Sequence, residues 1–412
     1  MDVIWRVEIF LSIMAFVWLF ILLIDRFYDL ESHGISLGPG TLTWRTQRGL
    51  SLLDRISRLS EGGWRIFGIF AAVGGIILMV LMFAFFALGT ILGVVTVGLL
   101  GGSSSLPAGA ESKVVAIPGV TIPFVLGIIG LATVLLVHEP AHGIVLRHLN
   151  LKTKSTGLLL FLVIPGAFVE QDEEEFEKAS FWKRIQVAGA GPMANVLFSV
   201  LCLGLVLALV NPLHGVFISG IVENRPADEA GMRPGVYITG IEGIQVTNYG
   251  DMEKFMEGSR PGETLTLTVS DERSQEENQY YVTLDNHPTS SENEGYLGVL
   301  LIRSYPESSF FRPEIFFLTA LDEILGYPRI NQQAYGAPVP WFLVEVLKWM
   351  FALNLLVALF NLLPLKPLDG GHIIEGLAEK FTSKSMAEGI ANVVGFATLS
   401  LIVLSIGLII MG

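Results

Sequence analysis

Two histidines and a glutamate stand together in the motif His138-Glu139-Pro140-Ala141-His142. On a helix, residues four apart share a face, so both imidazole rings can point at one metal ion. The glutamate between them lies beside that metal and can take a proton from its bound water. The motif therefore predicts zinc-dependent hydrolysis. The structural alternative is a pair of helix-end histidines near a membrane surface beside a glutamate whose charge reaches water.

A catalytic zinc site requires a third protein ligand, for which Asp369 is the best candidate. It ends the segment Asn361-Leu362-Leu363-Pro364-Leu365-Lys366-Pro367-Leu368-Asp369, directly before two glycines. A carboxylate at the end of an apolar run costs roughly 2.5–3.5 kcal/mol unless another group compensates it, and a zinc ion would do so. The alternative is an aspartate that only caps the turn. His372 follows the two glycines and is interpreted as structural rather than as a ligand.

The composition places these residues in a membrane protein. The chain has 412 residues, of which 51% are hydrophobic and only 16% are charged. Its mean hydropathy of +0.59 is too high for an ordinary soluble protein. The net charge of −13 argues against a nucleic-acid partner. The single cysteine, Cys202, excludes a disulfide framework and a cysteine-based zinc site.

Six apolar runs are long enough to cross the hydrocarbon core of a bilayer, which takes roughly 20 residues. The first run has no small-residue cleavage site and is interpreted as an anchor helix. The second continues past Leu88 as a glycine-broken extension. The chain is thus predicted to be a polytopic α-helical membrane protein. The runs are Ile9–Ile24, Ile66–Ala110, Val114–Val137, Ile185–Leu213, Trp349–Leu365 with Trp341–Val344 before it, and Gly389–Gly412.

The loop between the first and second spans carries the arginines that set the orientation. Because cytoplasmic loops carry an excess of basic residues, this loop is expected in the cytoplasm. The third and fifth spans then both run from outside to inside, so that His142 and Asp369 reach the same cytoplasmic depth. The arginines are Arg26, Arg45, Arg48, Arg55, Arg58 and Arg65.

Between the fourth and fifth spans the pattern changes to short β-like runs separated by turn residues, which predicts an inserted α+β domain. The predicted strands are Val216–Val222, Val236–Ile241, Thr264–Ser270 and Tyr280–Leu284, with short helices at Ala227–Gly231 and Asp251–Glu257. The predicted organisation is an anchor helix with the arginine-rich loop (1–65), a first membrane region (66–212), the inserted domain (213–303), an interfacial connector (304–340) and a second membrane region (341–412).

Five stretches together resemble the site-2 protease family of intramembrane zinc metalloproteases. That family pairs an HExxH helix with a later Asn-x-x-Pro…Leu-Asp-Gly segment, and both patterns stand here at His138–His142 and Asn361–Gly370. One departure is Lys366, where the family commonly has a second proline. The other stretches are Pro165–Glu170, similar to the family's membrane-associated hairpin, Ala190–Asn195, similar to its Gly-Pro-…-Asn signature, and Gly215–Ser270, similar to a PDZ domain.

The resemblance implies regulated intramembrane proteolysis with Zn²⁺ as the cofactor. Asn195 has an alternative role as an asparagine that packs helices. The residues so implied are His138, His142 and Asp369 as zinc ligands, Glu139 as the general base, and Asn361 and Asn195 at the substrate backbone.

The expected substrates are transmembrane proteins whose helix unwinds to expose its backbone. The segment Gly157–Val169 is expected to hold the unwound stretch by strand addition. The PDZ-like domain is expected to bind an exposed chain end, with Gly215–Ile218 resembling the strand start that faces a carboxylate. Alternatively, it acts as a steric filter that admits substrates trimmed first by another protease.

Two other functions fit parts of the pattern. One is a non-catalytic membrane adaptor that docks partners through the PDZ-like domain, although such a protein has no need of Glu139. The other is a transporter or ion channel, which predicts a repeat between two halves of the chain. No such repeat is visible in the sequence. The absence of a cysteine-rich outer insertion favours a prokaryotic cell membrane, including an archaeal one, over an internal eukaryotic membrane.

Overall fold

The structure is a computed structural model that describes residues 3–95, 123–161, 164–212, 215–270, 277–286, 294–302 and 335–411. The described residues form two compact units. The membrane unit comprises residues 3–203 and 345–411, and the inserted module comprises residues 204–302 and 335–344.

Six helices among the described residues are long and apolar enough to cross a membrane, which confirms the predicted polytopic helical fold. Large apolar side chains project outward from them, such as Phe85 at 69% exposure and Phe396 at 74%. Lipid is as apolar as these side chains, so they need no burial inside the protein. The predicted extension of the second span beyond residue 95 lies outside the described residues. The six helices are α1 (Val3–Tyr28), α3 (Glu61–Gly93), α4 (Phe124–His148), α6 (Phe181–Leu209), α11 (Trp341–Asn361) and α13 (Lys384–Met411).

The helices differ from the predicted apolar runs where charged residues lie inside a helix. α6 begins at Phe181, before Lys183 and Arg184, and α11 continues unbroken through Glu345 and Lys348. Lys348 Nζ lies 3.4 Å from a carboxylate oxygen of Glu345, one turn earlier, so the two charges compensate each other within the helix. A prediction from hydropathy alone therefore begins α6 too late and splits α11 into two apolar runs.

Small residues and hydroxyl groups bring the helices of the membrane unit together. A Cβ at Gly189 in α6 would lie 2.3 Å from the carbonyl oxygen of Ala71 in α3, so only glycine permits this approach. Thr90 Oγ1 lies 2.6 Å from Ser405 Oγ and joins α3 to α13. Close packing and hydrogen bonds of this kind hold helices together in lipid, where no hydrophobic force drives their association.

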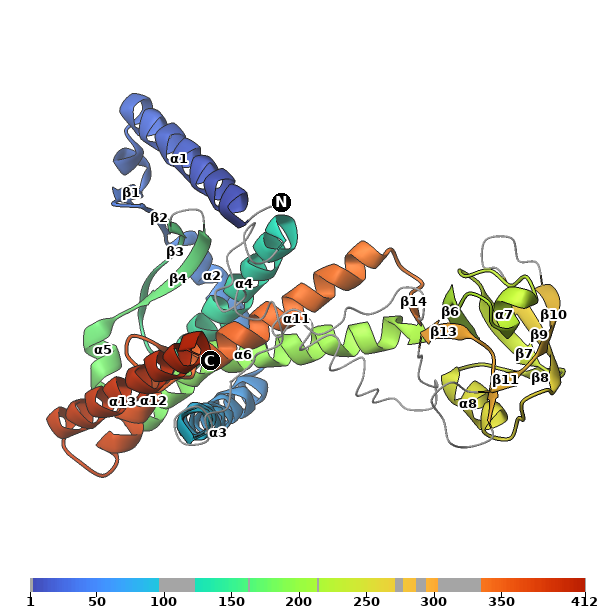
Figure 1. Cartoon of the computed structure of the whole chain (residues 1–412). Coiled ribbons are helices and arrows are strands. Elements are labelled where there is room, and N and C mark those ends of the chain that lie inside the picture. The colour runs from blue at the N-terminus through green and yellow to red at the C-terminus, as the bar shows by residue number, and fades with distance from the viewer. Residues whose placement is uncertain are drawn as a thin grey trace. The chain divides into compact units, whose positions relative to one another are not determined.

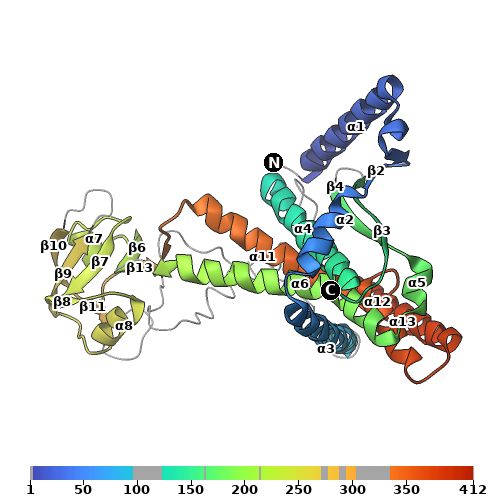
Figure 2. The same ribbon diagram turned by 180° about the vertical axis from the view of Figure 1, so that it is seen from behind.

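The turn between α11 and α12 (Asp369–Glu379) positions the candidate carboxylate ligand. α11 ends at Asn361 and α12 begins at Asp369. A Cβ at Gly370 would lie 2.4 Å from the carbonyl oxygen of Leu362, so the start of α12 packs tightly against the end of α11. α12 then lies beside α13 in both views of the molecule (Figure 1, Figure 2).

A four-stranded antiparallel sheet in the order β1-β2-β3-β4 belongs to the membrane unit. Its strands β3 and β4 form the predicted hairpin, whereas β1 and β2 lie in the arginine-rich loop, where the sequence predicts no strand. β2 pairs with β3, so that Thr41 lies opposite Phe161 and Thr46 opposite Thr156. Among the described strands β4 has a neighbour on one side only. The elements are β1 (Ile35–Gly38), β2 (Thr41–Thr46), β3 (Thr153–Phe161) and β4 (Ile164–Gln171), with the short helices α2 (Arg48–Ser57) and α5 (Glu173–Lys178).

The inserted module is an α+β unit whose largest sheet has the order β10-β9-β7-β6-β13, with β8 beside β7. Side chains alternate between its faces, so that Leu265, Leu267 and Val269 of β9 are buried and the threonines between them are not. The Asn248 side chain caps α8 by accepting a hydrogen bond from the N–H of Asp251. The elements are β6 (Val216–Ile221), α7 (Pro226–Glu229), β7 (Tyr237–Ile241), β8 (Ile244–Gln245), α8 (Tyr249–Glu257), β9 (Thr264–Ser270), β10 (Glu277–Thr283), β11 (Asp285–Asn286), β12 (Gly295–Tyr296) and β13 (Val299–Ile302).

The strands predicted in this part of the chain correspond to β6, β7, β9 and β10, and β9 matches its predicted residues at both ends. Most of the predicted connector lies outside the described residues. Its last part includes β14 (Tyr335–Gly336), which pairs with β5 (Asn211–Pro212).

Candidate metal centre

Three side chains from α4 and the start of α12 bring their ligand atoms to one point. His138 Nε2 lies 3.1 Å from His142 Nε2, and the Asp369 carboxylate oxygens lie 3.3 Å from the first nitrogen and 3.6 Å from the second. Tetrahedral zinc, with bonds of about 2.0–2.2 Å, holds its ligand atoms about 3.3–3.5 Å apart. All three atoms lie within 4.8 Å of one another. The distances and the donor set therefore fit a zinc ion.

The backbone of α6 orients the ring of His142 by contacting the ring nitrogen that faces away from the other candidate ligands. Its Nδ1 lies 2.7 Å from the carbonyl oxygen of Val187. A carbonyl oxygen only accepts hydrogen bonds, so Nδ1 carries the proton and donates it. In the neutral ring Nε2 is then bare and points toward the other two ligands. This is the usual arrangement of a metal-binding histidine, whose second nitrogen is fixed by a hydrogen bond.

His138 has a corresponding partner in Asn195, which is fully buried in α6. The amide nitrogen of Asn195 lies 3.2 Å from His138 Nδ1. The Asn195 Oδ1 is buried and has no hydrogen-bond partner among the described residues. A half-turn of the amide exchanges two groups of nearly identical shape and lets Oδ1 accept from Nδ1–H. That arrangement satisfies the oxygen and leaves His138 Nε2 bare for the metal.

Gly191 in α6 leaves the space in which a metal would lie. A Cβ at this position would lie 2.3 Å from His142 Nε2 and 2.7 Å from His138 Nε2. Any side chain at residue 191 would therefore fill the point on which the ligands converge. This space is an independent indication that the residues fit the ion.

The third candidate ligand is a half-buried carboxylate. The side chain of Asp369 is 18% exposed, against 8% for His138 and 14% for His142. Its two carboxylate oxygens lie beside the Nε2 atoms of both imidazoles, so an ionised carboxylate here would supply a negative charge to a cation bound at this point.

Glu139 lies next to the ligand cluster and is tied to the sheet. Its Oε2 accepts a hydrogen bond of 3.2 Å from the backbone N–H of Val169 in β4. The bond uses an N–H on the side of β4 that faces away from β3. The glutamate is therefore held between the metal centre and the unpaired edge of the sheet.

A cavity of about 330 Å³ opens onto the cluster and is lined by residues of α4, β4, α5 and α6, by the end of α11, and by the turn before α12 with the first residues of α12. Asn361 lies on its wall, with Nδ2 3.5 Å from His138 Nε2. His372 also lines the cavity but is not one of the three grouped ligands among the described residues. Asn195 does not line it, because this side chain lies behind His138.

Lys366, the departure from the family pattern, does not line this cavity. Its Nζ lies 2.8 Å from a carboxylate oxygen of Glu375 in α12, which compensates its charge. The neighbouring Pro367 lines the cavity instead. The lysine therefore adds no free charge to the wall on this side.

The structure brings together five of the six residues singled out in the sequence around one cavity, and places the sixth, Asn195, behind a ligand. Sequence reasoning assigned no role to Gly191 or Val187, and it included Val169 only in the segment expected to hold substrate, without the contact to Glu139. The first of these stands in the Gly-Pro-…-Asn signature, four residues before Asn195 and so on the same face of α6. For the two backbone contacts the sequence carries no signal, because any residue supplies an N–H or a carbonyl.

Six apolar helices and a His-His-Asp cluster beside a glutamate define a membrane-embedded zinc metalloprotease. The chain belongs to peptidase family M50, whose model matches residues 126–404. That match begins in α4 and ends in α13, so it contains every residue of the cluster.

Two curated relatives illustrate the similarity. An uncharacterized protein of Methanocaldococcus jannaschii is 27% identical over 376 residues, which cover 90% of this chain and 86% of that protein. The zinc metalloprotease RasP of Shouchella clausii is 27% identical over 287 residues, which cover 60% of this chain and 66% of that protein.

Proposed function

We propose that this protease cuts transmembrane proteins within or near the bilayer, with His138, His142 and Asp369 as its zinc ligands and Glu139 as its general base. The observation that carries the proposal is the convergence of three ligand atoms beside Glu139, two of them from within the candidate span α4 and the third from the start of α12. Zinc, when bound, lowers the pKa of a water to about 7 and polarises the scissile carbonyl.

Glu139 takes the proton of the attacking water and passes it to the leaving amine. The hydrogen bond from Val169 N–H holds one of its carboxylate oxygens, which leaves the other to exchange protons. Asn361 lies on the cavity wall and carries an amide that can hydrogen-bond a substrate backbone. For Asn195, burial behind His138 favours a positioning role over direct contact with substrate.

The unpaired edge of β4 is proposed to hold the unwound substrate. In an antiparallel strand, every second residue directs its N–H and C=O to the same side. Val169 N–H faces Glu139, so the N–H and C=O of Ala167 face that side as well. An extended segment paired with Ala167 would run past Glu139 and bring its backbone to the metal centre.

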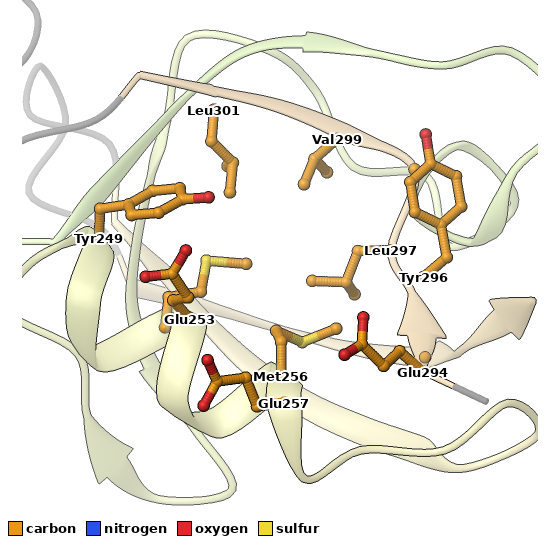
Figure 3. Close-up of a pocket in the computed structure, with 12 residues that line it drawn as sticks. Tyr249, Glu253, Met256, Glu257, Glu294, Tyr296, Leu297, Val299 and Leu301 are labelled. Carbon is orange, nitrogen blue, oxygen red and sulfur yellow. The ribbon is translucent and has the colours of Figure 1, made fainter. Parts of the chain in front are cut away.

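The inserted module is proposed to be a PDZ-like selector of substrates. A groove of about 380 Å³ lies between α8 and β12–β13, and Figure 3 shows Val299 and Leu301 of β13 pointing into it opposite Met256 of α8. β13 ends its sheet among the described strands, so an extended segment can pair with it. The groove does not include Gly215–Ile218, the strand start singled out in the sequence.

The catalytic proposal is tested with purified protein and a single-span substrate, with and without a zinc chelator. Cleavage should stop on chelation and return on addition of zinc, with the cut inside or at the edge of the span. Cleavage that persists in a sample without measurable zinc would refute the proposal.

The selector proposal is tested by replacing Gly215–Ile302 with a flexible linker. One substrate is compared in two forms, with a large outer domain and trimmed. The whole protein should prefer the trimmed form, whereas the deletion should cut both forms at similar rates. A deletion variant that binds zinc but cuts neither form would show that the module presents substrate instead of filtering it.

A further inference from the structure

A second cavity in the membrane unit has a volume of about 900 Å³ and shares no lining residue with the cavity at the metal centre. Its walls come from α2, from the first turns of α3, from the end of α4 with the loop that follows, and from the first turns of α6. Nothing in the proteolytic mechanism uses this space.

The lining of this second cavity is strongly basic. It contains five lysines and arginines but only two carboxylates, Asp54 and Glu61. Asp54 is already engaged, because its Oδ1 lies 3.3 Å from Arg147 Nε. Since like charges close together repel, an excess of basic groups around one space favours the binding of an anion. The basic residues are Arg58, Arg65, Arg147, Lys152 and Lys183.

Two of the basic groups are free to bind an anion. Lys183 Nζ donates to the carbonyl oxygen of Leu149, and Lys152 lies 3.5 Å from Glu175. By contrast, Arg58 and Arg65 have no ion pair with any described residue. A guanidinium group presents a planar fork of donors that matches phosphate oxygens.

The position of the cavity indicates the source of the phosphate. α3 begins at Glu61, α4 ends at His148 and α6 begins at Phe181, so the cavity lies where three candidate spans have their ends. The positive-inside rule puts these ends at the cytoplasmic face. The cytoplasmic leaflet carries the anionic lipids, and basic pockets between spans on this side bind their headgroups.

The cavity also has an apolar part, which a free phosphate ion would not need. Ile69 lies two turns into α3, and Trp182 lies in the first turn of α6. Tryptophan is typical of the boundary between headgroups and acyl chains. The lining thus changes from arginines to apolar side chains, which matches a ligand with a charged headgroup and an apolar chain.

We propose that this cavity binds the headgroup of an anionic phospholipid. Arg58 and Arg65 hold the phosphodiester, Arg147 and Lys183 add positive charge, and Ile69 and Trp182 contact the first part of the acyl chains. The site is independent of the substrate proposed above. α4 also carries His142, and α6 carries the Val187 carbonyl that orients this histidine. A bound lipid would therefore contact both helices that hold the metal centre.

The test uses the full-length protein in a neutral detergent and measures its thermal unfolding midpoint during titration with lipid. Phosphatidylglycerol should raise the midpoint in a saturable way. Phosphatidylcholine with the same acyl chains should not do so, and neither should inorganic phosphate. Equal shifts with the two lipids would overturn the proposal, and this comparison needs no variant.

The matched variants have the same net charge and differ only in position. Arg58→Gln with Arg65→Gln removes the two free guanidinium groups from the cavity, whereas Arg26→Gln with Arg55→Gln removes two arginines that do not line it. The first pair should weaken the apparent affinity for phosphatidylglycerol tenfold or more, and the second pair should leave it within twofold. Equal losses in both pairs would reduce the effect to general surface charge.

Two further outcomes would assign the cavity to another ligand. If inorganic phosphate alone gives the full shift, the site holds a free anion. If a soluble acidic peptide raises the midpoint and phosphatidylglycerol does not, the cavity receives a protein segment. Either result would overturn the lipid proposal.

Discussion

Among the described strands, the membrane unit and the inserted module each contain a sheet that ends on a strand with one unpaired edge beside a cavity. In the membrane unit this strand is β4, and in the module it is β13. The cavity beside β4 receives two imidazoles and two carboxyl groups that converge, whereas the groove beside β13 is lined by apolar side chains and by Glu253, Glu257 and Glu294 (Figure 3). Among the described residues only the first holds a group of metal-ligating side chains.

With the functions proposed above, the difference separates recognition of a polypeptide by the module from cleavage of its backbone in the membrane unit. An unpaired strand edge can bind an extended chain through main-chain hydrogen bonds, largely without regard to its sequence. Hydrolysis of a peptide bond requires, in addition, catalytic side chains that other parts of the fold hold in position. The module lacks such a set among its described residues, so changes to its groove should affect the choice of substrate but not the reaction.

The largest effect is expected from removal of the base. Glu139→Gln should lower the cleavage rate by about 10²–10⁴-fold, since general acid–base catalysis is lost while all three zinc ligands remain. Zinc content, measured by atomic absorption, should stay near that of the unchanged protein. Glu174→Gln on the exposed side of α5 serves as the control. Near-normal cleavage by the Glu139 variant would remove the distinction between the two cavities.

A single methyl group added at residue 191 is expected to prevent metal binding. Gly191→Ala places a Cβ where the ligands converge, so the purified protein should contain little zinc and should not cleave. Gly204→Ala, in the same helix, has open space around its Cβ and should keep both zinc and activity. The role given to Gly191 fails if its variant binds zinc normally.

Asp369→Asn should also lose zinc, because a neutral amide is a poor ligand.

Substitutions of Asn195 test which atom of its amide group faces His138. Asn195→Leu should weaken zinc binding by about 10–100-fold, as loss of a group that orients a ligand does. Asn195→Asp should retain zinc, because a carboxylate oxygen also accepts the hydrogen bond from His138 Nδ1–H. Competition with a zinc-sensitive dye measures both affinities. If the aspartate variant is as weak as the leucine variant, the amide nitrogen faces the ring.

The strand edge should contribute less than the metal centre. Ala167→Pro removes one outward N–H from an edge strand, which tolerates proline. Loss of one hydrogen bond should lower kcat/KM by roughly 2–10-fold, with zinc content unchanged. Ala167→Ser keeps the N–H and is the control. An unchanged kcat/KM in the proline variant would mean that substrate does not pair with this residue.

The smallest effect on chemistry is expected from the module. Leu301→Asp puts a charge into the groove, whereas Leu300→Asp puts it on the exposed side of the same strand. The first should change the preference between trimmed and untrimmed substrate severalfold, and the second should not. Neither should alter the cleavage rate of a short substrate without an outer domain. A slower reaction on that short substrate would link the module to chemistry.

Sequence reasoning worked best where one local pattern determines the outcome. The spacing of His138 and His142 predicts a shared helix face, and the cost of a carboxylate at an apolar segment singles out Asp369. Alternation of apolar residues predicts β9 to the residue. In these cases the relevant information lies within a few neighbouring residues or in one energetic term.

It failed where a role depends on a partner far away in the chain. β2 is stabilised by pairing with β3, and the two strands are separated by more than a hundred residues, so the arginine-rich loop carries no signal of its partner. The contact of Asn195 with His138 depends on how α6 packs against α4. The space at Gly191 has the same origin. Such roles belong to tertiary packing, which neither hydropathy nor spacing describes.

The separation of the ligands along the chain has a consequence for synthesis of the enzyme. Asp369 leaves the ribosome more than two hundred residues after His142. At about 5–20 residues per second, this interval lasts roughly ten seconds or more. During that time a chain with α4 and α6 in the membrane carries only two of the three proposed ligands, and such an incomplete site is expected to bind zinc weakly and to be inactive. The order of the proposed ligands along the chain thus delays proteolytic activity until Asp369 has been synthesised.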